Sequence, residues 1–233
     1  MHVLILALVL TTTLGSLASQ SIPKLLVIGL DGVRPDALAA ANTPSLDALI
    51  AAGCYSADAQ CENLTFSGPN WSTILHGVHR DRHGVISNAY TLSQLANFPD
   101  FFAYLEAHQS SWNTVRITTW DAIYLYQPTG ADIDLFSNYA TGGDAVATQG
   151  AEQLMAGSHP SYPGLDVDAM FVYLADADVA GHSTGFHPAS PTYLQELADI
   201  DFQIGCIVTA MQARANYGNE DWLIIMTSDH GGS

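Results

Sequence analysis

Three apolar runs constrain the fold of this chain more than any other feature of its sequence. They are KLLVIGL at 24–30, AMFVYL at 169–174 and WLIIM at 222–226. A continuous apolar run without polar alternation is typical of a strand buried on both faces of a parallel sheet. Parallel strands need long crossover connections, which are usually helices. The runs therefore predict an α/β fold, with a mostly parallel central sheet and helices on both faces.

The stretches between these runs supply the other elements of the predicted fold. Strands are expected at 54–61 and 113–118, and helices at 42–50, 100–107, 144–155 and 190–211. The rest of 124–163 is rich in Tyr, Gly, Pro and Asp, and we expect it to be an excursion over the sheet edge. At 233 residues and without internal repeats, the chain is long enough for one domain with a substantial core.

The first residues predict a signal peptide. The apolar run VLILALVL at 3–10 is followed by small and polar residues up to Ala18, where cleavage is expected. The run is too short to span a bilayer. We therefore expect a signal peptide at 1–18, a single domain at 19–233, no transmembrane segment in the mature chain, and export to the periplasm or the extracellular space.

The charge balance limits the kind of partner. The chain has 6 Lys and Arg residues against 23 Asp and Glu residues, a net charge of −17. Proteins that bind nucleic acids hold the phosphates with clusters of Lys and Arg, so no nucleic-acid-binding surface is expected here. Most of the carboxylates are expected to keep an exported protein soluble, and some to bind cations.

Acidic and imidazole side chains follow each of the three apolar runs. Asp31 comes directly after the first run, Asp178 and His182 follow the second, and Asp229 and His230 follow the third. The carboxyl ends of parallel strands meet at one edge of the sheet, where open α/β proteins place their chemistry. Carboxylates and imidazoles are also ligands of divalent metals. We interpret these residues as metal ligands on strand-end loops, although each alone could be a turn or loop residue.

A helix is expected to start at Ser67 and to end near Gly77. Ser67 is predicted as its N-cap, Pro69 suits the first turn, and Trp71 and Leu75 lie on one face. The free N–H groups and the positive dipole end of a helix start favour an alkoxide, or a phosphate attached to one. The alternative is that Ser67 only caps the helix. The polar strand ends favour a nucleophile.

An ordered set of motifs covers most of the chain. The motifs are LDGVRPD at 30–36, NTPSLDAL at 42–49, SGPNWSTILHG at 67–77, HGV at 83–85, DVAGHSTGFHP at 178–188 and TSDHGG at 227–232. Together they resemble the alkaline phosphatase superfamily, and within it most closely the type I phosphodiesterase or nucleotide pyrophosphatase/phosphodiesterase group. The resemblance implies an alkaline-phosphatase-like catalytic domain and an exported, metal-dependent hydrolase of phosphodiester or pyrophosphate bonds, acting on a small phosphate ester.

The resemblance also implies two zinc ions and a role for each matched residue. One ion is bound by Asp31, Ser67, Asp229 and His230, and the other by Asp178 and His182. Asn70 matches an asparagine that helps to hold a phosphoryl oxygen. Ser67 is expected to attack phosphorus and to form a phosphoserine, which zinc-activated water then hydrolyses.

Two departures from the group bear on substrate choice. Ser67 stands where threonine is common, and Gly68 replaces a bulky aromatic residue. A sulfatase is a poor interpretation, because Trp71 replaces the arginine that sulfatases need. A phosphomonoesterase is an alternative, although no Lys or Arg closely follows Ser67 to hold the extra phosphate charge. A second alternative is a non-catalytic extracellular binding module on the same fold.

The chain ends at Ser233, before the further zinc-binding histidine that the resemblance implies. His187 is considered as a substitute ligand, but we expect a C-terminally incomplete domain whose second zinc site lacks a ligand. The isolated chain should therefore bind the second zinc ion poorly and hydrolyse bis-p-nitrophenyl phosphate slowly. Initial rates and metal content, measured on this chain, check the prediction, and full activity would contradict it.

Overall fold

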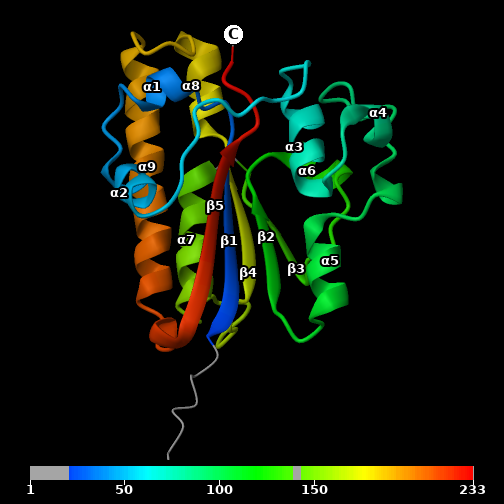
Figure 1. The fold of residues 1–233 in the computed structure, drawn as a ribbon, viewed down its shortest axis with the longest axis vertical. Coiled ribbons are helices and arrows are strands. Elements are labelled where there is room, and N and C mark those ends of the chain that lie inside the picture. The colour runs from blue at the N-terminus through cyan, green and yellow to red at the C-terminus, as the bar shows by residue number, and fades with distance from the viewer. Residues whose placement is uncertain (1–20, 139–142, 233) are drawn as a thin grey trace, which may run out of the picture.

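The structure of this chain is a computed structural model that describes residues 21–138 and 143–232. The predicted signal peptide at 1–18 lies outside the described residues. Within them, five strands form one sheet in the order β3-β2-β4-β1-β5, and every pair of neighbours is parallel. The predicted α/β fold with a parallel central sheet is confirmed (Figure 1).

The strands follow the apolar runs closely. They are β1 (Ile22–Leu30), β2 (Thr114–Thr118), β3 (Ile133–Phe136), β4 (Ala169–Leu174) and β5 (Glu220–Ser228). Every residue of β2 and β4 is buried, because both strands lie inside the sheet and helices cover its two faces (Figure 1). β5 lies at the edge of the sheet, and most of its side chains alternate between half-buried and exposed. Each of the three opening apolar runs is therefore confirmed as a strand.

Helices cover both faces of the sheet, with α2, α7, α8 and α9 on one side and α3, α5 and α6 on the other (Figure 1). The α-helices are α1 (Pro35–Leu38), α2 (Pro44–Ala52), α3 (Ser67–His76), α4 (Arg80–His83), α5 (Phe101–His108), α6 (Asp121–Tyr126), α7 (Gly143–Met155), α8 (Asp176–Thr184) and α9 (Pro191–Gln212). Short 3-10 helices span Leu95–Asn97 and Tyr217–Asn219. In the described part of the chain, no helix combines the length and the apolar character needed to cross a membrane.

Alternate residues of β1 pack into two different cores. Leu26 and Ile28 belong to the larger core, which includes buried residues of α7 and α9. Val27 belongs to the smaller core, together with Trp71 of α3. Gly29 lies against the same ring, since a Cβ there would be 2.5 Å from Trp71 Cη2. The missing side chain at Gly29 lets Trp71 pack against β1, and this contact holds the start of α3 beside the end of that strand.

The strand expected at 54–61 is absent. All of these residues are exposed, and they form neither a helix nor a strand. A strand needs a neighbour to satisfy its backbone N–H and C=O groups. In the described sheet β5 pairs only with β1, so the segment forms no backbone pairing with the free edge of β5.

The stretch at 124–163 is more regular than predicted. It contains β3, which pairs with β2 and so forms the edge of the sheet instead of crossing over it. Asp134 of β3 accepts two hydrogen bonds from the buried guanidinium of Arg116 in β2, at 2.8 and 2.7 Å. This ion pair offsets the cost of placing the charged Asp134 in the sheet. With its 4 residues, β3 is too short to show a clear sequence pattern.

We predict that Gly29→Ala destabilises the protein by about 1 to 3 kcal/mol, the usual cost of overpacking a core. The added methyl group would meet the Trp71 ring, which is fully buried and cannot move aside. Urea unfolding followed by circular dichroism measures the change. Gly150→Ala in α7 is the control, because its Cβ would meet only Ile117 Cδ1, at 4.0 Å. That variant should be as stable as the parent or more stable by up to about 1 kcal/mol, and an equal loss in both variants would contradict the prediction.

Candidate active site

Three segments meet at the carboxyl end of the sheet. Asp31 directly follows β1, α8 begins just after β4, and Asp229 and His230 directly follow β5. Because β1 lies between β4 and β5, three adjacent parallel strands deliver these groups to one place. The structure therefore brings together the residues that the sequence predicts as ligands, with Ser67 of α3 beside them.

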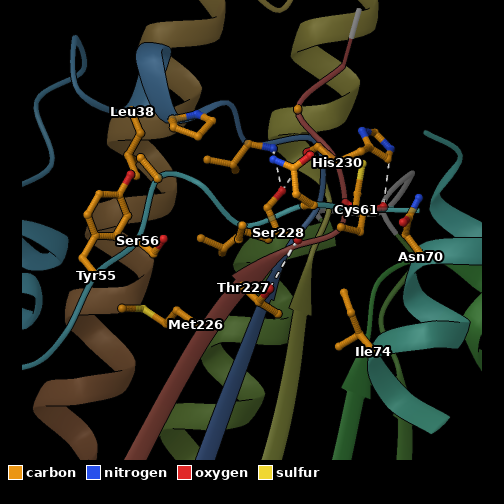
Figure 2. Close-up of a pocket in the computed structure, with 18 of the residues that line it drawn as sticks. Leu38, Tyr55, Ser56, Cys61, Asn70, Ile74, Met226, Thr227, Ser228 and His230 are labelled. Atoms are coloured by element: carbon orange, nitrogen blue, oxygen red, sulfur yellow. Dashed lines mark hydrogen bonds and ion pairs between the residues drawn. The ribbon is translucent and has the colours of Figure 1, made fainter. Parts of the chain in front are cut away.

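His230 lies at the centre of this cluster, above the end of β5 (Figure 2). Its Nε2 is 3.4 Å from Asp31 Oδ1, 3.4 Å from Asp229 Oδ2 and 3.9 Å from Asp178 Oδ1. The ligand atoms of Asp31, Asp229 and His230 lie within 4.8 Å of one another, and all three residues are buried. Two carboxylates and an imidazole form a donor set that suits zinc and related divalent cations.

Ser67 faces the cluster. The helix α3 starts at Ser67, as predicted, but its N-cap is Phe66 and Ser67 is its first helical residue. The Ser67 hydroxyl lies 3.4 Å from Asp31 Oδ1 and 3.2 Å from His230 Nε2. The prediction of Ser67 as the N-cap was wrong. The Ser67 side chain is buried beside Asp31 and His230.

Asp178 and His182 lie on a helix, α8, and not on the predicted loop. They are one turn apart, with Asp178 Oδ2 3.5 Å from His182 Nε2. Gly32 has a φ of 69° and allows the close approach of α8, because a Cβ there would lie 2.8 Å from Asp178 Oδ1. Gly181 in the same helix makes room for the Phe186 ring, because a Cβ there would lie 2.3 Å from Phe186 Cδ1. The side chain of His182 is 72% exposed, so this side of the cluster opens to solvent.

Carboxylate oxygens of the cluster are buried without a partner in the described part of the chain, and a bound cation would reduce the cost of burying their charge. Asp178 Oδ1 and Asp229 Oδ2 are buried and have no hydrogen-bond partner among the described residues. Burial and the nearby charge of Asp31 raise the pKa of Asp178 to about 7, and they raise the pKa of Asp229 well above its ordinary value. Burial lowers the pKa of His230 and so favours the neutral imidazole that binds metals. Unpartnered buried carboxylate oxygens beside a neutral imidazole fit a divalent cation.

Asn70 is engaged within the chain. Its Nδ2 donates to Leu64 O at 2.8 Å and to Phe66 O at 2.9 Å, and its Oδ1 accepts from Glu62 N at 2.8 Å. The side chain therefore ties the loop before Ser67 to α3. The predicted contact with a phosphoryl oxygen stays a prediction. In this arrangement the Asn70 amide donates both of its hydrogens to backbone carbonyl groups.

Asn88 is a residue near the site that the sequence analysis missed. It is exposed, and its Oδ1 accepts from the backbone N–H of Gly68, next to Ser67, at 2.8 Å. No local pattern marks this asparagine, because the loop that carries it reaches Gly68 only through the tertiary fold. His187 is exposed and accepts a hydrogen bond from Ala189 N at 3.0 Å, a local contact that gives no support to its role as a substitute ligand.

Two aromatic residues also contact the cluster and were predicted only as core. Tyr173 OH donates to Asp31 Oδ2 at 2.5 Å, and Trp71 Nε1 donates to the same oxygen at 2.9 Å. Burial and the charge of Asp31 raise the pKa of Tyr173 well above its ordinary value, so the phenol stays a neutral donor. Apolar patterning identifies such residues as buried but does not show which polar atom they meet.

A cavity of about 970 Å³ adjoins the cluster at Asp229 and His230. Apolar side chains of β5 and α2 line it together with the segment around Tyr55, and Figure 2 shows Tyr55 and Leu38 across from Ile74 and Asn70. Such a space can hold the organic part of a substrate whose reacting group lies at the cluster.

Both the sequence and the fold of this chain are similar to those of known proteins. The sequence profile of the type I phosphodiesterase / nucleotide pyrophosphatase family matches residues 25–124 and 161–233. The chain is 26% identical over 232 residues to the bis(5'-adenosyl)-triphosphatase of Bos taurus, an alignment that covers 93% of this chain and 49% of the relative. The chain thus spans about half the length of the curated relatives that it matches.

Two solved structures share the fold. One is murine ectonucleotide pyrophosphatase / phosphodiesterase 5, in an inactive form in complex with AMP, with a TM-score of 0.68, 18% identity, and coverage of 90% of this chain and 57% of that chain. The other is a putative sulfatase of Bacteroides fragilis, with a TM-score of 0.63, 16% identity, and coverage of 94% of this chain and 64% of that chain. At these identities the likeness shows the fold alone. The family profile, which matches most of the sequence, places this chain in the type I phosphodiesterase / nucleotide pyrophosphatase family.

Proposed function

We propose that this protein is an exported hydrolase of phosphodiester or pyrophosphate bonds in which Ser67 is the nucleophile. The observation that carries the proposal is the position of Ser67 Oγ, 3.4 Å from Asp31 Oδ1 and 3.2 Å from His230 Nε2 at the start of a helix. A hydroxyl used only for structure has no reason to lie among so many costly polar groups. Family membership supports the same chemistry.

The donor set supports two divalent cations, and the mixture of carboxylate and imidazole favours zinc. Asp31, Asp229 and His230, with Ser67, would hold one cation, and Asp178 and His182 would hold the other. When bound, such cations supply positive charge that lowers the pKa of coordinated hydroxyl groups and neutralises phosphoryl oxygens. This occupancy would also compensate the buried oxygens of Asp178 and Asp229 that have no other partner.

The residues of the chain carry out the reaction in two displacements. Ser67 Oγ forms a bond to phosphorus while the bond from phosphorus to the leaving oxygen breaks, and the leaving group takes up a proton. Water then attacks the phosphoserine, the bond from Ser67 Oγ to phosphorus breaks, and the serine regains its proton. The dipole at the start of α3 favours the charge that develops beside Ser67.

The substrate is proposed to be a diester or pyrophosphate and not a monoester. A monoester carries an additional negative charge that calls for another cationic group. Arg34 comes shortly after Asp31, but its guanidinium is paired with Asp36 at 2.9 and 2.7 Å. The complex of the murine relative with AMP and the name of the bovine triphosphatase favour a nucleotide-like substrate. The cavity beside Asp229 has room for its organic part.

Replacing Ser67 by alanine tests the proposal. The rate on bis-p-nitrophenyl phosphate should fall by about a thousandfold or to background, because no nucleophile remains, and zinc content should be retained. Ser72→Ala is the matched control in the same helix, since that hydroxyl donates to Gly68 O at 2.6 Å, and its rate should stay close to that of the parent. No bound zinc, together with equal rates for the parent and Ser67→Ala, would favour the binding module. Faster cleavage of p-nitrophenyl phosphate than of the diester would favour a monoesterase.

Removing one carboxylate tests the electrostatic basis of the site. The folded pKa of Asp178, about 7, lies above its ordinary value of 3.8, so the metal-free folded protein retains a proton that the unfolded chain releases. The contribution of Asp178 to the free energy of unfolding is therefore complete below about pH 4. It is lost as the pH rises to about 7 and beyond. In EDTA at pH 8, Asp178→Asn should raise the free energy of unfolding by about 1 kcal/mol or more, and at pH 4 the gain should vanish.

Urea unfolding in EDTA at the two pH values gives the measurement. The control is Asp36→Asn, which alters an exposed ion pair outside the cluster and should change stability little at either pH. In excess zinc the order should reverse, because the parent gains binding free energy that the variant loses. An Asp178→Asn protein less stable than the parent in EDTA at pH 8 would contradict the prediction.

A further inference from the structure

The two carboxylate oxygens of Asp31 have different surroundings. Oδ1 is the oxygen near Ser67 Oγ and His230 Nε2, at 3.4 Å from each. Oδ2 accepts hydrogen bonds from Tyr173 OH at 2.5 Å and from Trp71 Nε1 at 2.9 Å. The side chain is therefore held from one side while the other side faces the cluster.

The two donors are themselves fixed. Trp71 is 0% exposed and Tyr173 is 2% exposed, and their rings pack edge to face at a centroid distance of 5.1 Å. Trp71 belongs to α3 and Tyr173 to β4, so the donors come from two different elements that pack in the same smaller core. Gly29 provides the space in which the Trp71 ring lies.

We propose that Trp71 and Tyr173 are positioning residues that hold Asp31 Oδ2, so that only Oδ1 is presented to the cation and to Ser67. The inference rests on the proposed function, because it assigns Asp31 to a metal site. A carboxylate without these donors can rotate and present either oxygen or both. Hydrogen bonds to the outer atom of a metal ligand commonly decide how tightly the metal is bound.

The experiment measures zinc binding without substrate or turnover. Zn²⁺ alone is titrated into the metal-free chain in competition with a chromogenic chelator. Tyr173→Phe removes the hydroxyl and keeps the ring, and its dissociation constant for Zn²⁺ should rise by about tenfold or more. Unfolding in EDTA establishes that the variant is folded. Should it fail to fold, Trp71→Phe, which removes the indole N–H, is measured instead and should show the same direction of change.

Tyr90→Phe is the matched control. Tyr90 is also buried, but its hydroxyl accepts from the Gln127 amide at 2.6 Å and contacts no carboxylate of the cluster. A merely structural role of a buried hydroxyl would affect Tyr90→Phe and Tyr173→Phe alike, whereas the proposed role leaves zinc binding by Tyr90→Phe unchanged.

The outcomes separate this inference from the proposed function. Weakened binding in Tyr173→Phe alone supports the positioning role. Tight binding by the parent with an unchanged constant in Tyr173→Phe, or an equal loss in both variants, overturns the positioning role and leaves the metal site standing. No zinc binding by the parent overturns the metal site itself, and the positioning role with it.

Discussion

The mutual repulsion of buried carboxylates is the constraint on which the site depends. Asp31, Asp178 and Asp229 converge on His230, and two of their oxygens are buried without a hydrogen-bond partner in the described structure. Such an arrangement is unfavourable in a medium of low dielectric constant unless positive charge is present. A single loop could relax away from this strain. Three adjacent parallel strands cannot, because each is held by the sheet and by the cores on its two faces.

The packing of the core is therefore part of the chemistry. Gly29 admits the Trp71 ring, and that ring places α3, with Ser67 at its start, beside the end of β1. The same indole donates to Asp31, so one side chain links the smaller core to the cluster. Gly32 acts in a similar way for Asp178, because any side chain at that position would hold α8 away. Stability and site geometry are coupled through these close approaches.

The predictions succeeded where a local pattern is sufficient. The apolar runs identified β1, β4 and β5, and the motifs identified the residues that gather at the ends of those strands. They failed where the partner of a segment decides its state. Residues 54–61 have a strand-like pattern but no neighbouring strand, and Asp178 was assigned to a loop although its segment forms a helix. Tertiary packing overrides local propensity in such cases.

The sequence by itself determined the fold class and the chemical types available at the sheet edge, since burial periodicity and residue type are local properties. Only the tertiary structure decided which atoms meet. Ser67 and His230 are 163 positions apart, and Tyr173 is 142 positions from Asp31. The orientation of Asp31 depends on such a distant contact, and the place of Asn88 depends on a contact that spans 20 positions. A hydrogen bond between remote residues forms only when the whole sheet and its helices have fixed both partners, and no spacing along the chain records it.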